Sequence, residues 1–355
     1  MGWYSSLTVM TLGIVGWAPA WLMAQQPPVA TAPQAVVQTS ASAPAATVNG
    51  EVISEAAVQR ELKFAAPQDV AKLRPAIVNN LVDLMLIDQY LRQSKVEASA
   101  DEIELRFKRM QEEAKKEGNM DLKQLLEKLG VSEPELRTML TADLRWENFV
   151  KAQADDAKLE QFFTGNKIMF DGSEVHGRHV LIAVKADAPA AEKQAAQAKL
   201  AGLKASILKR ADELAAKNDP NADTVTKAKN KLENLESAFA ETAAKESDCP
   251  SKKNGGDLGF FPRIGVMVDG FAAAAFALEP GTMTDVVETQ FGYHVILCIE
   301  KKPGKDVKFA DIKEGVREVY GEKLKQVMVP QLKQRAQITI SPAPAVEAIA
   351  PPAGK

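Results

Sequence analysis

Two of the three histidines in this chain of 355 residues stand where an imidazole could take part in chemistry. His179 and His294 each lie in a predicted strand with apolar flanks, whereas His176 comes just before the first of these strands. Cys249 lies between them in sequence, and a thiolate with a histidine as its base can attack a carbonyl carbon. No nucleophile signature of a cysteine protease surrounds Cys249, however. A single strand histidine is also often a buried core residue, so the neighbouring motifs must decide.

Several short motifs accompany these residues within one short stretch of chain. A glycine-rich segment at 254–261 reads Asn-Gly-Gly-Asp-Leu-Gly-Phe-Phe, and Met267 and Phe271 follow it four residues apart. The last two motifs are Phe276-Ala-Leu and Thr289-Gln-Phe-Gly-Tyr-His294. The glycine-rich segment lacks a P-loop or dinucleotide fingerprint, so it does not predict a phosphate site.

In these motifs the chain resembles the parvulin family of peptidyl-prolyl cis/trans isomerases. The resemblance covers residues 174–302, from Arg178-His179-Val180-Leu181 through Ser247-Asp248-Cys249 to Gly292-Tyr293-His294. It implies four polar residues at the catalytic centre, which are His179, Cys249, Thr289 and His294. It also implies a pocket for the substrate's proline ring, formed by Leu258, Met267 and Phe271 with Phe276 as the back wall.

The residue types suit that reaction on physical grounds. Rotation about an X-Pro bond meets a barrier of about 18–20 kcal/mol, which comes from amide resonance. No bond is broken, so no strong nucleophile is needed. Because a twisted amide has lost part of its charge separation, an apolar pocket that grips the prolyl ring favours the twisted form over the planar one.

The loop after the first predicted strand bears on the substrate. Phospho-directed parvulins carry an arginine cluster there, whereas residues 183–190 contain one lysine and one aspartate, Lys185 and Asp187. One lysine beside one aspartate cannot form the multidentate clamp that a phosphate prefers. The expected substrate is therefore an unphosphorylated X-Pro segment.

The elements before this domain are helical. Ser54 is predicted to cap a first helix after a short strand or hairpin arm at 47–53, and a long amphipathic helix follows at 70–93. Ser99 with Glu102 and Ser132 with Glu135 form capping boxes that open two more helices. Pro330 is expected to end or kink a late helix at 309–335, which precedes a short β-like run at 337–340.

This layout resembles the SurA/PrsA class of exported chaperone isomerases. The expected fold is an α+β parvulin domain with the order β-α-α-β-α-β-β and a four-stranded antiparallel sheet, inserted into an all-α chaperone-like module. The predicted parts are a signal peptide at 1–24, a disordered Pro/Ala linker at 25–46, a helical N-terminal module at 47–165, a parvulin domain at 172–302 with an extended helical region at 190–235, a C-terminal helix and strand at 305–340 that pack on the N-terminal module, and a disordered tail at 341–355.

The uncharged, apolar segment at 1–24 predicts export. The alternative is an uncleaved anchor that would keep the protein on the membrane, facing the same compartment. We therefore expect a periplasmic or other extracytoplasmic location. In such an oxidising space Cys249 and Cys298 could in principle pair, although two cysteines alone do not make a disulfide framework.

Composition limits the partners. With 44 basic and 47 acidic residues the net charge is -3, so the chain offers no basic field for nucleic acid. Two cysteines and three histidines predict neither a metal site nor another cofactor. The expected partners are unfolded or nascent exported polypeptides with X-Pro bonds. The alternative function is a holdase chaperone whose parvulin domain only binds clients.

Overall fold

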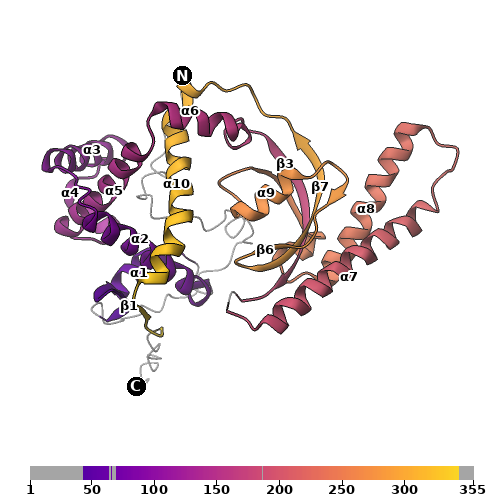
Figure 1. Cartoon of the computed structure of the whole chain (residues 1–355), viewed down its shortest axis with the longest axis horizontal. Helices are drawn as coiled ribbons and strands as arrows, with labels where there is room; N and C mark the ends of the chain where they lie inside the picture. The colour runs from indigo at the N-terminus through magenta and orange to yellow at the C-terminus, as the bar shows by residue number, and fades with distance from the viewer. Residues whose placement is uncertain (1–42, 64, 66–68, 186, 344–355) are drawn as a thin grey trace, which may run out of the picture. The chain divides into compact units, whose positions relative to one another are not determined.

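The structure is a computed structural model that describes residues 43–63, 65, 69–185 and 187–343. The predicted signal peptide, most of the predicted linker and tail residues 344–355 lie outside the described residues. Contacts divide the chain into two compact units. Of the described residues, 43–162 and 312–343 form the first, here the helical unit, and 163–311 form the second, here the sheet unit (Figure 1).

A small sheet lies in the helical unit, so the prediction of an all-α module is wrong. Strands β1 (Pro44–Val48) and β2 (Glu51–Ser54) form a hairpin, and β8 (Ile338–Ile340) pairs with the other edge of β1, all antiparallel. The start of β1 at Pro44 shortens the predicted linker. Ala45 and Ala46 have low β propensity, which hides this strand in sequence, but both are fully buried.

Residues with defined hydrogen bonds extend past 340, the predicted end of the C-terminal helix and strand. Ser341 was expected to begin the disordered tail, but its backbone N–H donates to Ala45 O over 2.9 Å. Arg74, which forms a buried ion pair with Glu55, also donates to Ser341 O. These contacts fix the end of β8 to residues that lie almost 300 positions earlier.

The helices of this unit begin and end at the expected signals. Both predicted capping boxes are present, and Asp121 with Gln124 forms a third. The helices of the unit, two of which continue into the sheet unit, are α1 (Glu55–Leu62), α2 (Val70–Gln93), α3 (Ala100–Gly118), α4 (Leu122–Leu129), α5 (Glu133–Gln153), α6 (Asp156–Gly165) and α10 (Phe309–Arg335). None of the helices in the described ranges combines the length and hydropathy that a membrane span requires.

Helix α10 does not end at Pro330, contrary to expectation. It runs through this proline to Arg335, and its non-helical backbone lies instead at Ile312, with φ of -130° and ψ of 16°. Ile312 is also where the contact boundary between the two units falls. A proline inside a helix removes one backbone hydrogen bond and presses its ring against the carbonyl four residues earlier, and α10 continues despite that cost.

The sheet unit contains five strands rather than the predicted four. Its elements after the 3-10 turn η4 (Lys167–Met169) are β3 (Glu174–Ala183), α7 (Ala190–Ala215), α8 (Thr224–Glu246), the 3-10 turn η5 (Pro250–Asn254), β4 (Asp257–Pro262), α9 (Asp269–Ala277), β5 (Thr282–Met283), β6 (Val287–Thr289) and β7 (Gly292–Lys302). The strand order is β4-β3-β7-β5, with β6 also paired to β7, and all pairs are antiparallel. The additional strand is β5. It has only two residues, which is too short to show the alternation of apolar and polar residues that predicts a strand.

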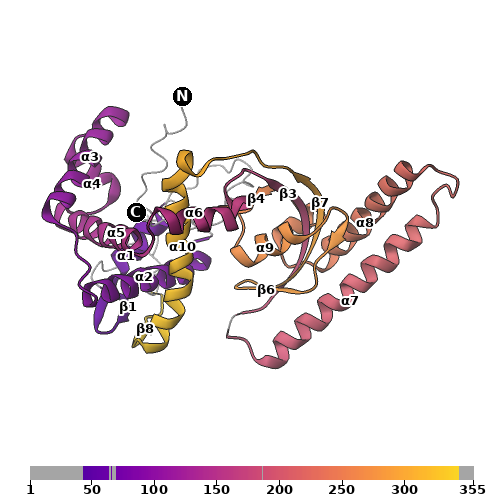
Figure 2. The same ribbon diagram turned by 45° about the horizontal axis from the view of Figure 1, so that its top comes forward.

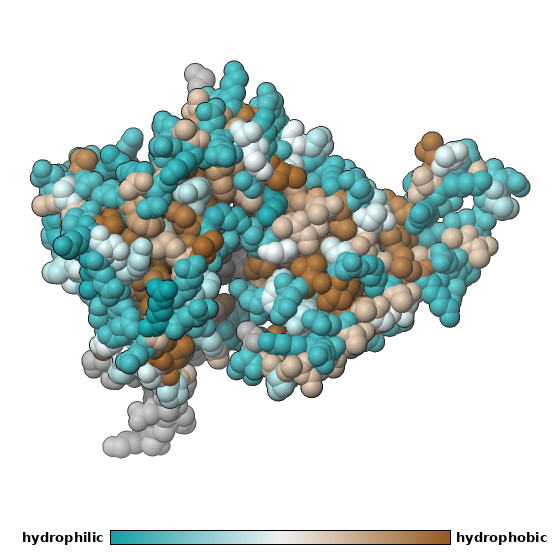
Figure 3. All heavy atoms as spheres, in the orientation of Figure 1, coloured by the Kyte–Doolittle hydropathy of each residue, from teal (hydrophilic) through white to brown (hydrophobic). Residues whose placement is uncertain are grey.

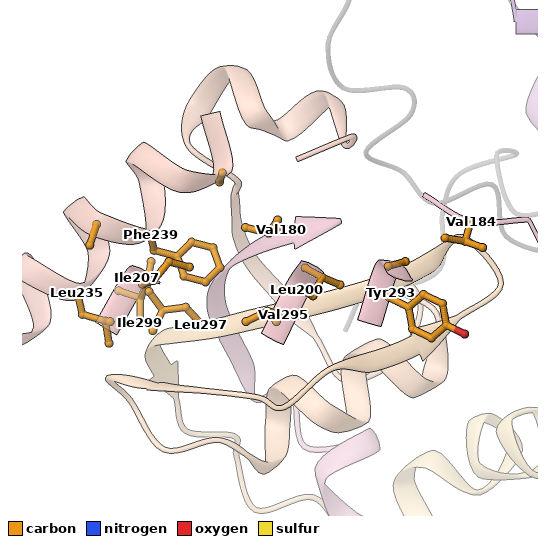
Figure 4. Packing of buried hydrophobic residues seen from close by; sticks show 13 residues of the cluster. Val180, Val184, Leu200, Ile207, Leu235, Phe239, Tyr293, Val295, Leu297 and Ile299 are labelled. Atoms are coloured by element: carbon orange, nitrogen blue, oxygen red, sulfur yellow. The ribbon is translucent and has the colours of Figure 1, made fainter. Parts of the chain in front are cut away.

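Both faces of this sheet are covered. On one face α7 and α8 pack against the sheet through a cluster that includes Phe239, Val180 and Leu297 (Figure 4). On the other face α9 covers a second cluster, which includes Phe271 and Ile296. Because β7 lies in the middle, its first eight residues are all buried, and alternate residues reach opposite clusters.

The α7–α8 hairpin extends past the sheet (Figures 1 and 2). Its buried residues lie between Ala196 and Ile207 on α7 and between Leu235 and Ala243 on α8. The end of the hairpin beyond them is mostly hydrophilic at the surface (Figure 3). The basic residues of this extended region therefore lie on a largely solvated surface.

Candidate active site

The two histidines singled out in sequence meet on one face of the sheet. His179 on β3 pairs with Ile296 on β7, and His294 pairs with Leu181, so the two imidazoles come from adjacent antiparallel strands. Their Nδ1 atoms lie 3.2 Å apart and their rings are nearly parallel, at 16°. Both residues are buried, with exposed fractions of 6% and 3%. The structure thus joins two residues that are 115 positions apart.

A hydroxyl lies at the outer nitrogen of each imidazole. Thr289 Oγ1 is 2.8 Å from His294 Nε2, and Ser251 Oγ is 3.1 Å from His179 Nε2. The four side chains Ser251, His179, His294 and Thr289 therefore form one continuous hydrogen-bonded row, here called the histidine row. Ser251 was not predicted. Its only sequence signal is its place two residues after Cys249, in the same loop.

Burial keeps the two imidazoles neutral. Loss of solvent, and then the nearby His294, lower the pKa of His179 to about 3, and burial lowers the pKa of His294 to about 4. At neutral pH one Nδ1 atom must donate and the other accept. The row then has two polarities. In one arrangement each group of the row donates its hydrogen bond in the direction from Ser251 to Thr289. In the other arrangement each group donates in the opposite direction.

Aromatic rings enclose the imidazoles on the side of α9. The ring of Phe271 meets both of them edge-on, with centroids 5.4 Å from His179 and 5.2 Å from His294. Phe271 belongs to a buried cluster with Met267 and Phe276, against which Leu258 is partly buried. The four residues predicted to hold the proline ring therefore lie together beside the histidine row.

Cys249 does not join the row. It is 1% exposed and comes directly before η5, and its backbone N–H donates to Ser247 Oγ over 3.3 Å. Across the described residues, its thiol makes no hydrogen bond to either histidine. Cys249 and Cys298 are both free thiols. The geometry offers no thiol–imidazole pair of the kind a cysteine protease uses.

The loop that carries Cys249 and Ser251 lies along one edge of β3; residues 247–256 are here called the edge loop. Asp248 N–H donates to Leu181 O over 2.8 Å, and the carboxylate of Asp248 accepts from Ala183 N–H over 2.9 Å. Gly256 has φ of +78°, and a Cβ there would lie 2.4 Å from His179 O. A glycine is therefore required where the loop returns to the strand.

Within the described ranges, no cluster of three or more His, Cys, Asp or Glu side chains could hold a metal ion. The described site thus consists of a neutral polar row and an apolar wall. Such a site can bind a ring and order a carbonyl group through hydrogen bonds without forming a covalent bond.

Comparisons with known proteins agree with this geometry. Residues 207–300 match the family described as Rotamase, PPIC-type PPIASE domain, a range that holds Cys249 and His294 and begins after His179. A Helicobacter pylori protein named as a peptidyl-prolyl cis-trans isomerase is 26% identical over 309 residues, 83% of this chain and 85% of that protein. The foldase protein PrsA of Bacillus subtilis is 34% identical over 145 residues, 39% of this chain and 46% of PrsA. The crystal structure of PrsA from Bacillus anthracis covers 73% of this chain and 94% of its own, with a TM-score of 0.40 and 20% identity.

The sheet unit thus contains a PPIC-type, or parvulin-type, domain. The chain therefore carries a parvulin-type domain, and its enzyme class is that of a peptidyl-prolyl cis/trans isomerase. The prediction of this family from the motifs between Arg178 and His294 is confirmed.

Proposed function

We propose that this isomerase acts on X-Pro bonds of unphosphorylated, exported proteins, at the site around His179 and His294. The observation that carries the proposal is the histidine row, which lies directly against the apolar cluster of Phe271. In this proposal, His179, His294, Thr289 and Cys249 surround the rotating carbonyl. Leu258, Met267, Phe271 and Phe276 hold the proline ring.

The reaction follows from the contrast between the two halves of the site. Twisting the X-Pro amide reduces its charge separation, so an apolar wall stabilises the twisted form relative to the planar ground state. The two imidazoles are neutral because their pKa values are lowered to about 3 and about 4. They therefore supply hydrogen bonds without a fixed charge that would favour the planar, more polar amide.

The preference for unphosphorylated segments rests on the sequence of residues 183–190. Lys185 and Asp187 are its only charged residues, and one lysine beside a carboxylate is a poor phosphate clamp. A phosphate before the proline would lose its hydration without gaining a bidentate partner.

We further propose an extracytoplasmic folding factor, with the parvulin domain inserted into a client-binding helical module. Export is supported by the uncharged segment at 1–24, and a folding role by the relative named foldase protein PrsA. The insertion is supported by the pairing of β8 with β1, which brings the C-terminal segment back to the N-terminal strand. Client contact is assigned to a shallow apolar hollow of about 520 Å³ on α4, lined by Leu122, Leu126 and Val131.

A refolding assay on the mature chain tests this proposal. A proline-limited substrate should refold faster with catalytic amounts of the wild type, and Met267→Ala should remove most of the acceleration. Suppression of aggregation by the same two proteins should be equal, because Met267 belongs to the core of the sheet unit, whereas α4 belongs to the helical unit. Absence of any acceleration, with intact suppression of aggregation, would favour the holdase alternative instead.

A further inference from the structure

Strand β3, which carries His179, has a strand beside one of its edges along its first half only. Along its second half a loop lies beside that edge. Strand β3 pairs with β4 only as far as Arg178. From there on the edge loop replaces β4, beginning with the hydrogen bond from His179 N–H to Gly256 O over 2.9 Å. Arg178 therefore stands at the point where strand pairing ends and the edge loop takes over.

The guanidinium of Arg178 binds two carbonyls of the edge loop and the carboxylate of Asp257, the first residue of β4. Its Nη1 donates to Asn254 O over 3.0 Å and to Gly255 O over 3.2 Å, and its Nη2 lies 3.2 Å from the Asp257 carboxylate. Only 16% of the side chain is exposed. A planar guanidinium with several fixed donors suits such a set of acceptors, whereas an ammonium acts as a single point charge.

Backbone hydrogen bonds hold the two ends of the loop on β3, at Leu181 and His179, and Arg178 adds contacts to the carbonyls of the glycine-rich segment near its end. Gly255 and Gly256 have φ of +63° and +78° and carry no side chains that could pack. Glycine loses more conformational freedom on folding than any other residue. Arg178 Nη1 would lie 3.3 Å from a Cβ at position 255, so the guanidinium packs directly on this part of the loop.

Two functional side chains flank the residues that Arg178 holds. Ser251, three positions before Asn254, forms the end of the histidine row, and Leu258, directly after Asp257, belongs to the apolar cluster. We propose that Arg178 is a positioning residue for catalysis. It sets the distance between the edge loop and β3 at which Ser251 reaches His179 and Leu258 reaches the proline pocket. This inference rests on the proposed site.

A purely structural arginine would change stability alone. A positioning arginine also changes the hydrogen bond at His179 Nε2 and the turnover of folded protein, because small displacements of reacting groups have large effects on rate. The two roles therefore differ in the imidazole NMR signals and in kcat measured per folded molecule.

The test compares Arg178→Met, Arg178→Lys, Ser251→Ala and the Arg178→Met/Ser251→Ala double variant in the full mature chain. Arg210→Met is the matched control, since it removes an exposed arginine that pairs with Glu241 between α7 and α8. Exchange NMR on an unphosphorylated X-Pro peptide gives kcat and KM. Imidazole ¹⁵N spectra report the state of His179, and far-UV circular dichroism gives the folded fraction.

We expect Arg178→Met to lower kcat roughly tenfold and to leave KM within about twofold, with a shifted His179 Nε2 signal. Arg178→Lys, which keeps the charge and is expected to fold, should lose less activity and still shift that signal. The double variant should be no worse than the more impaired single variant, because both changes act through one contact. Arg210→Met should match the wild type.

Three results would overturn the inference. The first is a wild-type kcat with unshifted His179 signals in both Arg178 variants. The second is a loss of activity that equals the unfolded fraction. The third is a double variant whose loss of activity is the product of the losses in the two single variants. The proposed site has a separate readout. If Ser251→Ala is impaired while the Arg178 variants are not, the histidine row stands and the role of Arg178 falls. If Ser251→Ala is fully active, the proposed catalytic role of the Ser251–His179 contact and the role of Arg178 fall together.

Discussion

The Nδ1 atoms of His179 and His294 lie 3.2 Å apart, so one of these buried imidazoles must donate a hydrogen bond and the other must accept it. The contact excludes a doubly protonated pair, because two imidazolium rings would place two N–H groups face to face. Folding therefore requires that at least one of the rings be neutral. This requirement gives the site a measurable dependence on pH.

We predict that the histidine pair makes folding stability fall as the pH drops below about 6.5. The pKa of His179 is lowered to about 3 and that of His294 to about 4, from an ordinary value of 6.5. Between these values the unfolded chain binds protons that the folded chain does not, so acid favours unfolding and stability is regained as the pH rises. Each such proton contributes a slope of about 1.4 kcal/mol per pH unit.

The free energy of unfolding, measured by urea titration at intervals of roughly one pH unit between about 4.5 and 7.5, checks this slope. The methyl NMR signals of Val295 and Leu297 report on the sheet unit. The free energy of unfolding of the wild type minus that of the His179→Asn/His294→Asn variant should rise with pH and level off above about 6.5. A difference that stays flat across the range would show that the pair is not held neutral by the fold.

Thr289→Val should destabilise the sheet unit by about 1–3 kcal/mol and lower kcat. The variant has nearly the same shape but leaves His294 Nε2 buried without its partner at 2.8 Å. Thr242→Val is the matched control, since Thr242 Oγ1 bonds only to Ala238 O of its own helix. Equal unfolding free energies for the two variants in urea titrations would argue against a special role of the Thr289 hydroxyl.

Phe271→Ala should cost about 3–5 kcal/mol of stability as well as activity. The family resemblance implies that Phe271 lines the pocket for the substrate's proline ring. The structure instead leaves only 3% of Phe271 exposed, among Phe261 and the two imidazoles. The expected result is therefore a less stable protein whose folded fraction is also inactive.

Phe239→Ala separates the two effects of that substitution. Phe239 is fully buried on the opposite face of the same sheet, away from the histidine row. Its loss should cost similar stability but leave kcat per folded molecule unchanged. If both variants show the same kcat per folded molecule, Phe271 has no part in the proline pocket.

Gly256→Ala should prevent the edge loop from docking on β3. A Cβ at this position would lie 2.4 Å from His179 O, and the backbone has φ of +78°, which disfavours any side chain. Gly202→Ala on α7 is the control, because a Cβ there meets nothing within 4 Å, and alanine in a helix should add about 0.5–1 kcal/mol. Thermal melts of both variants should therefore shift in opposite directions, and a Gly256→Ala protein as stable as the wild type would contradict the account.

The features that could be predicted from the sequence are local or repeat at short range. The capping boxes at Ser99 and Ser132 depend on residues three positions apart, and the structure has both. His179 and His294 could be placed in strands because an apolar run follows each of them, at 180–184 and at 295–299. Their common face followed from the family resemblance, since no pattern in one strand specifies its neighbour.

What the sequence did not reveal depends on contacts between distant segments. Ser251 has no distinguishing neighbours, and its role appears only once the edge loop lies against β3. The strand at Pro44 has the composition of a linker, and it becomes a strand because β8 pairs with it from the far end of the chain. The burial of Phe271 depends on Phe261 and the imidazoles, which come from three different strands.

Exchange NMR of an unphosphorylated X-Pro peptide with catalytic amounts of the protein tests the isomerase activity most directly. Uncatalysed exchange takes tens to hundreds of seconds. Cis–trans exchange cross-peaks are expected within about a second for the wild type, and their loss is expected in a folded Met267→Ala variant. A folded wild-type protein that leaves exchange at the uncatalysed rate, or a fully active Met267→Ala, would contradict this expectation.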